Sequence, residues 1–113
     1  MRDHRKLEAF ALADALVIHI YRLTCAFPKE ERYGLTSQMR RAAISIGANI
    51  VEGSARSSEA DYVRFLIIAY GSACELEYEI SVAERLGYLP DDGDVRLLAS
   101  RTCRALRGLV NAF

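Results

Sequence analysis

The sequence predicts an all-α fold, an antiparallel up-down four-helix bundle, and three observations lead to this prediction. A chain of 113 residues that is 51% hydrophobic fits a single globular domain over residues 1–113. Two prolines and seven glycines are too few turn residues for a sandwich or barrel. Four long apolar segments are separated by three short clusters of turn residues, and no strand-like alternation persists.

The first two expected helices cover residues 6–26 and 35–56. The first helix ends before Pro28, because the residue that precedes a proline is pushed out of the helical region. The second helix has Thr36 and Ser37 as candidate N-terminal caps, since their hydroxyl groups can accept from free backbone amides.

The last two expected helices cover residues 58–86 and 91–111. Ser58 begins the third helix as the first residue of an S-x-x-D capping box with Asp61. Gly87 supplies a left-handed stop after it. Short loops then favour antiparallel packing of consecutive helices.

Three cysteines, at positions 25, 74 and 103, form no CxxC pair. We expect Cys25, Cys74 and Cys103 to be buried free thiols in a reducing cytoplasm. The apolar stretch 7–27 resembles a signal peptide or membrane span, but Asp14 and other polar residues interrupt it. Each central charge costs about 2.5 to 3.5 kcal/mol on insertion. We therefore expect a cytoplasmic protein with no membrane partner.

Two apolar stripes on the third expected helix predict an oligomer. A helix at the edge of a monomeric bundle needs only one such stripe, and the first expected helix is also apolar nearly all round. The alternative is that a wide apolar face touches two neighbours within one chain. The stripe that we assign to the oligomer face comprises Val63, Leu66, Ile67, Tyr70 and Cys74.

Arginine outnumbers lysine thirteen to two, although the net charge is zero. This bias favours forked pairing with phosphate or carboxylate groups. On the last expected helix, arginines fall within an arc of about 140°, and the nucleic-acid contacts that we assign to it are Arg101, Arg104 and Arg107. The alternative is that these arginines, with Arg96, pair with acids of the neighbouring helix or of another subunit, namely Glu75, Glu77, Glu79 and Glu84.

A polar set on the second expected helix has two interpretations. Its arginines, Arg40, Arg41 and Arg56, are further candidates for nucleic-acid contact. We expect Arg41, Asn49 and Glu52 to form a structural hydrogen-bonded network that fixes register between helices or subunits. The alternative is a recognition patch on the surface of the assembly.

No constellation in the sequence predicts an enzyme. Neither histidine has a glutamate three residues before it, which excludes the Glu-x-x-His pairs of di-iron bundles. Glu75 and Glu79 are four residues apart, a spacing more often found on a solvated face. No serine triad or glycine-rich phosphate loop is present. We therefore expect no catalytic residue, no metal, no cofactor and no small-molecule substrate.

Two long motifs resemble the bacterial four-helix-bundle family encoded in 23S rRNA intervening sequences. The first comprises FPKEERYGLTSQMRRAAISI and NIVEG at residues 27–46 and 49–53, and the second comprises FLIIAYGSACELE and LGYL at residues 65–77 and 86–89. The match covers about residues 7–89. Many members have tryptophan where this chain has Phe10, and proline is common where it has Gly47. The second departure affects the local bend of the second helix.

The resemblance implies an up-down bundle assembled into a ring, usually a homopentamer, without known catalytic activity. It also implies kinship with the accessory proteins of diversity-generating retroelements, which are pentameric rings that bind nucleic acid and a reverse transcriptase. We therefore expect a non-enzymatic oligomeric interaction module that binds RNA, DNA or a nucleic-acid enzyme. The alternative is a structural or protein-binding scaffold without nucleic-acid affinity.

Overall fold

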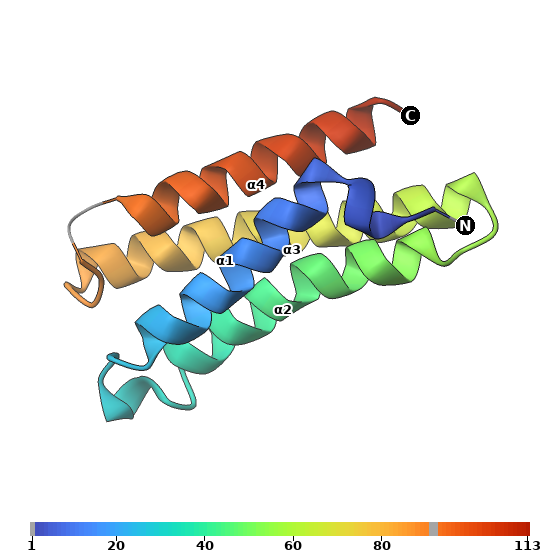
Figure 1. The fold of residues 1–113 in the computed structure, drawn as a ribbon. Coiled ribbons are helices and arrows are strands. Elements are labelled where there is room, and N and C mark those ends of the chain that lie inside the picture. The colour runs from blue at the N-terminus through green and yellow to red at the C-terminus, as the bar shows by residue number, and fades with distance from the viewer. Residues whose placement is uncertain (1, 91–92) are drawn as a thin grey trace.

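The computed structural model describes residues 2–90 and 93–113, and within these ranges the protein is all-α. The described residues form four α-helices and two short 3-10 helices, and no strand (Figure 1). This confirms the predicted helical class and the number of long helices. The elements are η1 (His4–Lys6), α1 (Glu8–Thr24), η2 (Lys29–Glu31), α2 (Leu35–Ser54), α3 (Glu59–Arg85) and α4 (Asp94–Asn111).

Each long helix packs against two others. The backbones of α2 and α4 each lie close to those of α1 and α3, whereas the backbones of α1 and α3 lie further apart. The four helices lie along the long dimension of a body of 43 × 25 × 19 Å (Figure 1). None of the described helices combines the length and apolar character that crossing a membrane requires.

The hydrophobic core draws on all four helices. Its largest aliphatic side chains are almost completely inaccessible, and burying each one stabilises the fold by about 1.5–3 kcal/mol. They are Leu16, Ile20, Met39, Ile46, Ile50, Leu66, Leu76, Ile80 and Leu106. Because the core lies between the helices, their outer faces carry the polar residues that concern function.

The two chain ends close one end of the bundle. The backbone amide of Arg2 donates to the carbonyl of Ser54 at 2.8 Å. The Arg2 guanidinium lies 4.2 Å from the centre of the buried Tyr62 ring, an arrangement that favours a cation over an aromatic face. Phe113 packs edge-on against the same ring at 5.7 Å. The N- and C-terminal segments therefore stabilise the junction of α2 and α3.

The start of α2 differs from the predicted capping. Thr36 is buried and lies inside the helix, and neither Thr36 nor Ser37 caps it. Instead the Glu31 carboxylate accepts from the backbone amide of Leu35 at 3.1 Å. The 3-10 turn η2 presents this carboxylate, so the cap comes from the preceding loop. The prediction of a Thr36 or Ser37 cap is wrong.

The ends of α3 follow the predicted pattern. Ser58 Oγ accepts from the backbone amide of Asp61 at 3.1 Å, which confirms the serine cap. Gly87 has φ of +77°, a left-handed conformation that favours glycine. The predicted start of the last helix at residue 91 lies outside the described residues, and α4 begins at Asp94.

Gly53 allows close approach of α2 to α3. A Cβ atom at this position would lie 2.7 Å from the Phe65 Cβ and 3.3 Å from the Tyr62 carbonyl oxygen. Any side chain at position 53 would therefore force the two helices apart.

We expect Gly53→Ala to destabilise the fold by about 1–3 kcal/mol, because α2 and α3 must separate to accept the methyl group. Gly108→Ala is the matched control, since no atom beyond the backbone of its own helix lies within 4 Å of the added Cβ. That control should be neutral or stabilising by up to about 1 kcal/mol, because alanine is the better helix former. Urea unfolding of the two variants measures both effects. Equal midpoints would contradict the close-packing argument.

Candidate functional site

The α4 arginines that we assigned to nucleic-acid contact lie on the surface. Arg101, Arg104 and Arg107 are all exposed. Of the alternative pairs with neighbouring acids, one forms within the chain: Arg96 Nε lies 3.0 Å from Glu84 Oε2. Among the described residues no salt bridge joins the other three arginines to an acid. Their guanidinium groups are available to an external anion.

The Arg40 side chain forms hydrogen bonds within the fold. Its Nε donates to Thr24 Oγ1 at 2.8 Å, and its Nη2 donates to the Tyr21 carbonyl at 3.2 Å. The guanidinium also lies 4.7 Å from the Tyr21 ring centre. These contacts join α2 to the last turn of α1, where carbonyl groups lack helical donors. The prediction of Arg40 as a free phosphate contact is therefore corrected, because its donors already serve the helix terminus.

Arg56 is also partly engaged. Its Nη2 lies 2.8 Å from Glu52 Oε1, and its guanidinium lies 4.9 Å from the Phe65 ring centre. Glu52 is exposed near the end of α2, and Arg56 follows just after that helix ends at Ser54. An exposed pair of this kind contributes about 0.3–0.5 kcal/mol. Arg56 thus has an acidic partner within the chain, and its contact with phosphate stays a prediction.

In the part of the chain that the structure describes, no hydrogen bond or salt bridge joins Arg41, Asn49 and Glu52 to one another. Asn49 Nδ2 donates to the Ser45 carbonyl at 2.8 Å and to Ser45 Oγ at 3.0 Å. Ser45 Oγ in turn lies 2.9 Å from Ser72 Oγ on α3. The polar link between α2 and α3 is therefore Asn49, Ser45 and Ser72. Arg41 and Glu52 take no part in it.

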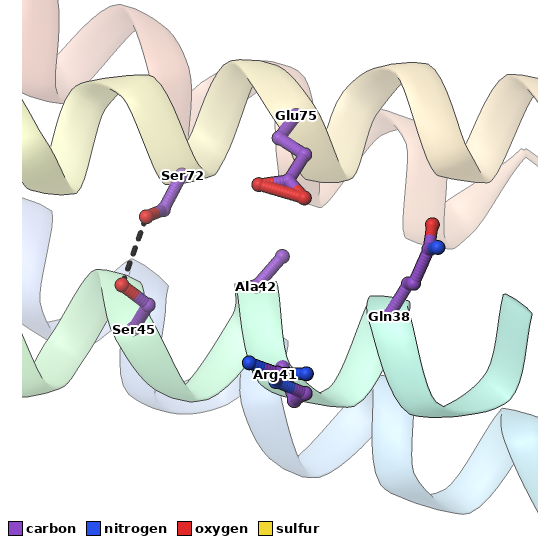
Figure 2. Close-up of a pocket in the computed structure, with 6 residues that line it drawn as sticks. All are labelled: Gln38, Arg41, Ala42, Ser45, Ser72 and Glu75. Carbon is purple, nitrogen blue, oxygen red and sulfur yellow. Dashed lines mark hydrogen bonds between the residues drawn. The ribbon is translucent and has the colours of Figure 1, made fainter. Parts of the chain in front are cut away.

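A polar groove runs between the outer faces of α2 and α3. It encloses about 430 Å³ and is lined by Gln38, Arg41, Ala42, Ser45, Ser72 and Glu75. Figure 2 shows the Glu75 side chain reaching from α3 into the space above Ala42, with the Ser45–Ser72 hydrogen bond closing one side. The small Ala42 side chain leaves room for this carboxylate. Because Arg41 lines the same groove, the groove contains both a positive and a negative side chain.

Glu79 lies one turn beyond Glu75 and is buried. Its exposed fraction is 4%, and its Oε1 has no hydrogen-bond partner. Burial, with the carboxyl of Glu75 beside it, raises the pKa of Glu79 to about 7. The expectation that Glu75 and Glu79 form a solvated face is wrong for Glu79. The serines and the glutamine that line the groove carry no charge and gave no signal in the sequence, whereas Glu75 of the Glu75 and Glu79 pair does line it.

The residues assigned to the oligomer face are divided by the fold. Ile67 is 52% exposed and Cys74 is exposed, while Val63 and Tyr70 are partly buried. Leu66 is completely buried in the chain's own core. We correct its assignment, because a side chain with no exposed surface cannot reach a second subunit.

The three cysteines are free, and two of them are exposed. Cys25 and Cys74 lie on the surface, whereas Cys103 is buried. The prediction of buried thiols is therefore wrong for Cys25 and Cys74. Burial raises the pKa of the Cys103 thiol, and Glu77 and Cys74 act in the same direction. Cys103 is thus held in its unreactive, protonated form.

Metal-binding chemistry has no candidate centre in the described part of the chain. No group of three or more histidine, cysteine, aspartate or glutamate side chains comes together there. The Glu75 and Glu79 carboxyls supply two oxygen-bearing groups, fewer than the ligands that calcium takes in a protein site.

Comparisons with known proteins give a family and a fold. A family model described as 23S rRNA-intervening sequence protein matches residues 5–108. A crystal structure of a protein with unknown function, from the S23 ribosomal protein family of Bacteroides thetaiotaomicron, aligns with a TM-score of 0.83 at 24% identity. The alignment covers 91% of this chain and 95% of that chain. No curated protein matches significantly.

We expect Glu79 to make stability fall as pH rises. In the unfolded chain Glu79 ionises near pH 4.5, whereas in the fold it keeps its proton up to about pH 7. Between these values the folded state binds the extra proton, so the free energy of unfolding decreases with pH by on the order of 2–3 kcal/mol. Glu79→Gln should remove this decrease and be the more stable protein at pH 8.

Urea unfolding from pH 4.5 to 8, at a dilution that keeps the chain monomeric, measures the effect. Glu59→Gln is the control, because Glu59 lies exposed on the same helix. Identical pH profiles for wild type and Glu79→Gln would contradict the assignment.

Proposed function

Because this chain belongs to the family of 23S rRNA-intervening sequence proteins, we propose that it is a non-enzymatic, homo-oligomeric interaction module that binds nucleic acid. The observation that carries the proposal is the row of exposed arginines on α4. Residues 95–113 hold four arginines and no acid, and three of these arginines have no acidic partner in the described structure.

The proposed subunit is an antiparallel, up-down bundle, and the proposed assembly is a closed ring, a homopentamer. Short connections between consecutive helices support the antiparallel arrangement. Large apolar side chains on the outer faces support assembly, because monomeric proteins rarely expose extended apolar patches. The exposed side chains include Ile44 and Val51 on α2, and Ile67, Ile68 and Tyr78 on α3.

A ring repeats any weak contact around its circumference. Arg101, Arg104 and Arg107 carry three positive charges on each subunit, and a zero net charge keeps the attraction of one subunit for phosphate modest. Linked copies bind more tightly than one copy without any new type of contact. RNA or DNA in the cytoplasm is therefore the proposed partner, and an enzyme that acts on nucleic acid is a further one.

The competing function is a protein-binding scaffold without nucleic-acid affinity. The observation in its favour is the same set of exposed apolar side chains, which fits a protein surface as well as a second copy. Capture of a protein partner that persists after nuclease treatment, together with no binding to nucleic acid at low salt, would select it.

Native mass spectrometry tests the assembly. A pentamer of the 12.6 kDa chain has a mass of about 63 kDa for a closed ring of five identical subunits, and we expect this species at micromolar concentration. An even-numbered oligomer would replace the pentamer but keep the module, whereas a monomer would refute the assembly.

Fluorescence anisotropy with structured RNA and duplex DNA tests the partner. We expect affinity that falls steeply with salt, because phosphate contacts release counterions. Replacing Arg101, Arg104 and Arg107 together by alanine should flatten the salt dependence by about one unit of slope for each arginine that touches a phosphate in the wild type. Arg32→Ala is the control, since it removes an exposed arginine elsewhere. Absence of binding at low salt would refute the proposal.

A further inference from the structure

We infer that the outer face of α3 binds the same face of a second copy of the chain, with the two α3 helices antiparallel and crossing at Gly71. Such a pair is two-fold and isologous, whereas neighbours in a closed ring of five meet through two different faces. The inference therefore goes beyond the proposed ring. The pair joins two free chains, or one chain of a ring to one chain of another ring.

The outer face of α3 carries large side chains that the described part of the chain leaves exposed. Ile67 is 52% exposed, Ile68 is 42% exposed and Tyr78 is 66% exposed. At 100° per residue, the exposed residues of this face all lie within about 60° of Gly71. They are Arg64, Ile67, Ile68, Cys74, Glu75 and Tyr78. The face therefore points away from the core and is open to a partner along four turns of helix.

Nothing in the described chain requires glycine at position 71, which is the centre of this face. Its φ is not positive, and a Cβ there would meet no atom within 4 Å beyond the backbone of its own helix. Glycine inside a helix is destabilising relative to alanine. It does leave the helix surface flat between larger side chains, and the side chains at a contact set how closely two helices approach. Position 71 is thus suited to the crossing point of a second helix.

The residues on either side of Gly71 match one another in an antiparallel pair. Seven residues are two helical turns, or about 10.5 Å. Arg64 and Tyr78 each lie seven residues from Gly71, so Arg64 of one copy stands level with Tyr78 of the other. Ile67 and Glu75 each lie four residues from Gly71 and are level in the same way.

The two sides of the face also match. Glu75 lies on the side towards α2, because it lines the groove between these helices. At 100° per residue, Arg64 falls on the same side of Gly71 as Glu75. Ile67 and Tyr78 fall on the other side. In a two-fold antiparallel pair each side of the face meets the same side of the other copy. Arg64 therefore lies beside Glu75 of the second copy, and Ile67 packs against Tyr78 of the second copy.

Charge selects both the orientation and the occupant. Within the chain Arg64 has one acidic neighbour, Asp61, at 3.8 Å, and both side chains are more than half exposed. Among the described residues no salt bridge involves Glu75. An antiparallel pair gives each of these charges an opposite charge, whereas a parallel pair in register would set like charges together. The outer face of α4 does not fit instead, because residues 95–113 hold four arginines and no acid and would repel Arg64.

Disulfide trapping tests the pair. Gly71→Cys, in a chain that also carries Cys25→Ser and Cys74→Ser, brings two thiols to the crossing point. A disulfide needs a Cα–Cα distance of about 4.4–6.8 Å, which closely packed helices provide there. We expect a covalent dimer after incubation with oxidised glutathione, which is reduced as the disulfide forms. Gly108→Cys in the same background is the matched control, since that glycine is equally open but lies among the α4 arginines. It should stay unlinked.

Two further variants test the register. In the antiparallel pair the two copies of Cys74 are offset by about 9 Å along the helix axis, so a Cys25→Ser chain that keeps Cys74 should form no covalent dimer. R64C/Y78C, in the background without Cys25 and Cys74, leaves Gly71 in place. Its two thiols are about 21 Å apart along one helix, so they can link only between copies. We expect this variant to link.

Charge reversal tests the ion pair. In the Gly71→Cys chain, Arg64→Glu and Glu75→Arg should each slow disulfide formation by about fivefold, because each places like charges together twice in the two-fold pair. R64E/E75R should restore the rate. Arg32→Glu is the control, since Arg32 is exposed in the loop before α2, and it should link at the parent rate. Far-UV circular dichroism should show every variant folded.

The outcomes separate this inference from the proposed function. A covalent dimer from neither Gly71→Cys nor R64C/Y78C overturns the pair. Equal linkage through Cys74 or through position 108 shows collision rather than docking and overturns it as well. Single charge variants that link at the parent rate, or a double variant without rescue, overturn the antiparallel charge match. None of these results depends on the ring, whose presence native mass spectrometry of the wild type decides.

Discussion

Close packing of α2 against α3 is the contact on which the rest of the structure depends. Gly53 brings the helix backbones together at one end, since a Cβ there would lie 2.7 Å from Phe65. The Ser45–Ser72 hydrogen bond of 2.9 Å joins the helices further along. The small side chain of Ala42 leaves space for the Glu75 carboxylate in the groove between these helices. The packing that holds the bundle together therefore also forms the polar groove.

Local signals in the sequence were sufficient to predict the helices and most of the features at their ends. The Ser58 cap and the Gly87 stop were predictable because each depends on a few adjacent residues. The α2 cap was not, because Glu31 acts from a separate turn in the preceding loop. Leu66 was assigned to an outer face because of the spacing of apolar residues. That spacing shows that the helix has two apolar stripes, but it does not show which neighbouring element covers each stripe.

The candidate site was harder to predict, because a charge in the sequence does not show what its side chain contacts. Arg40 and Arg104 are the same type of residue, yet Arg40 forms hydrogen bonds with Thr24 and Tyr21, whereas Arg104 is exposed. Glu79 lies four residues after Glu75, a spacing that is typical of a solvated helix face, yet its side chain is buried. Three-dimensional placement separates the arginines that stabilise the bundle from those that can meet a phosphate.

The central claim is that the exposed arginines of α4, rather than the arginine that the fold holds, meet the phosphate groups of a nucleic acid. An NMR titration of the arginine Nε–H signals with structured RNA at low salt, compared for Arg104 and Arg40, tests it most directly. The account predicts that the Arg104 signal shifts when RNA is added, because its side chain is exposed, and that the Arg40 signal stays in place, because its Nε donates to Thr24 Oγ1. A shifted Arg40 signal beside an unchanged Arg104 signal would contradict the account.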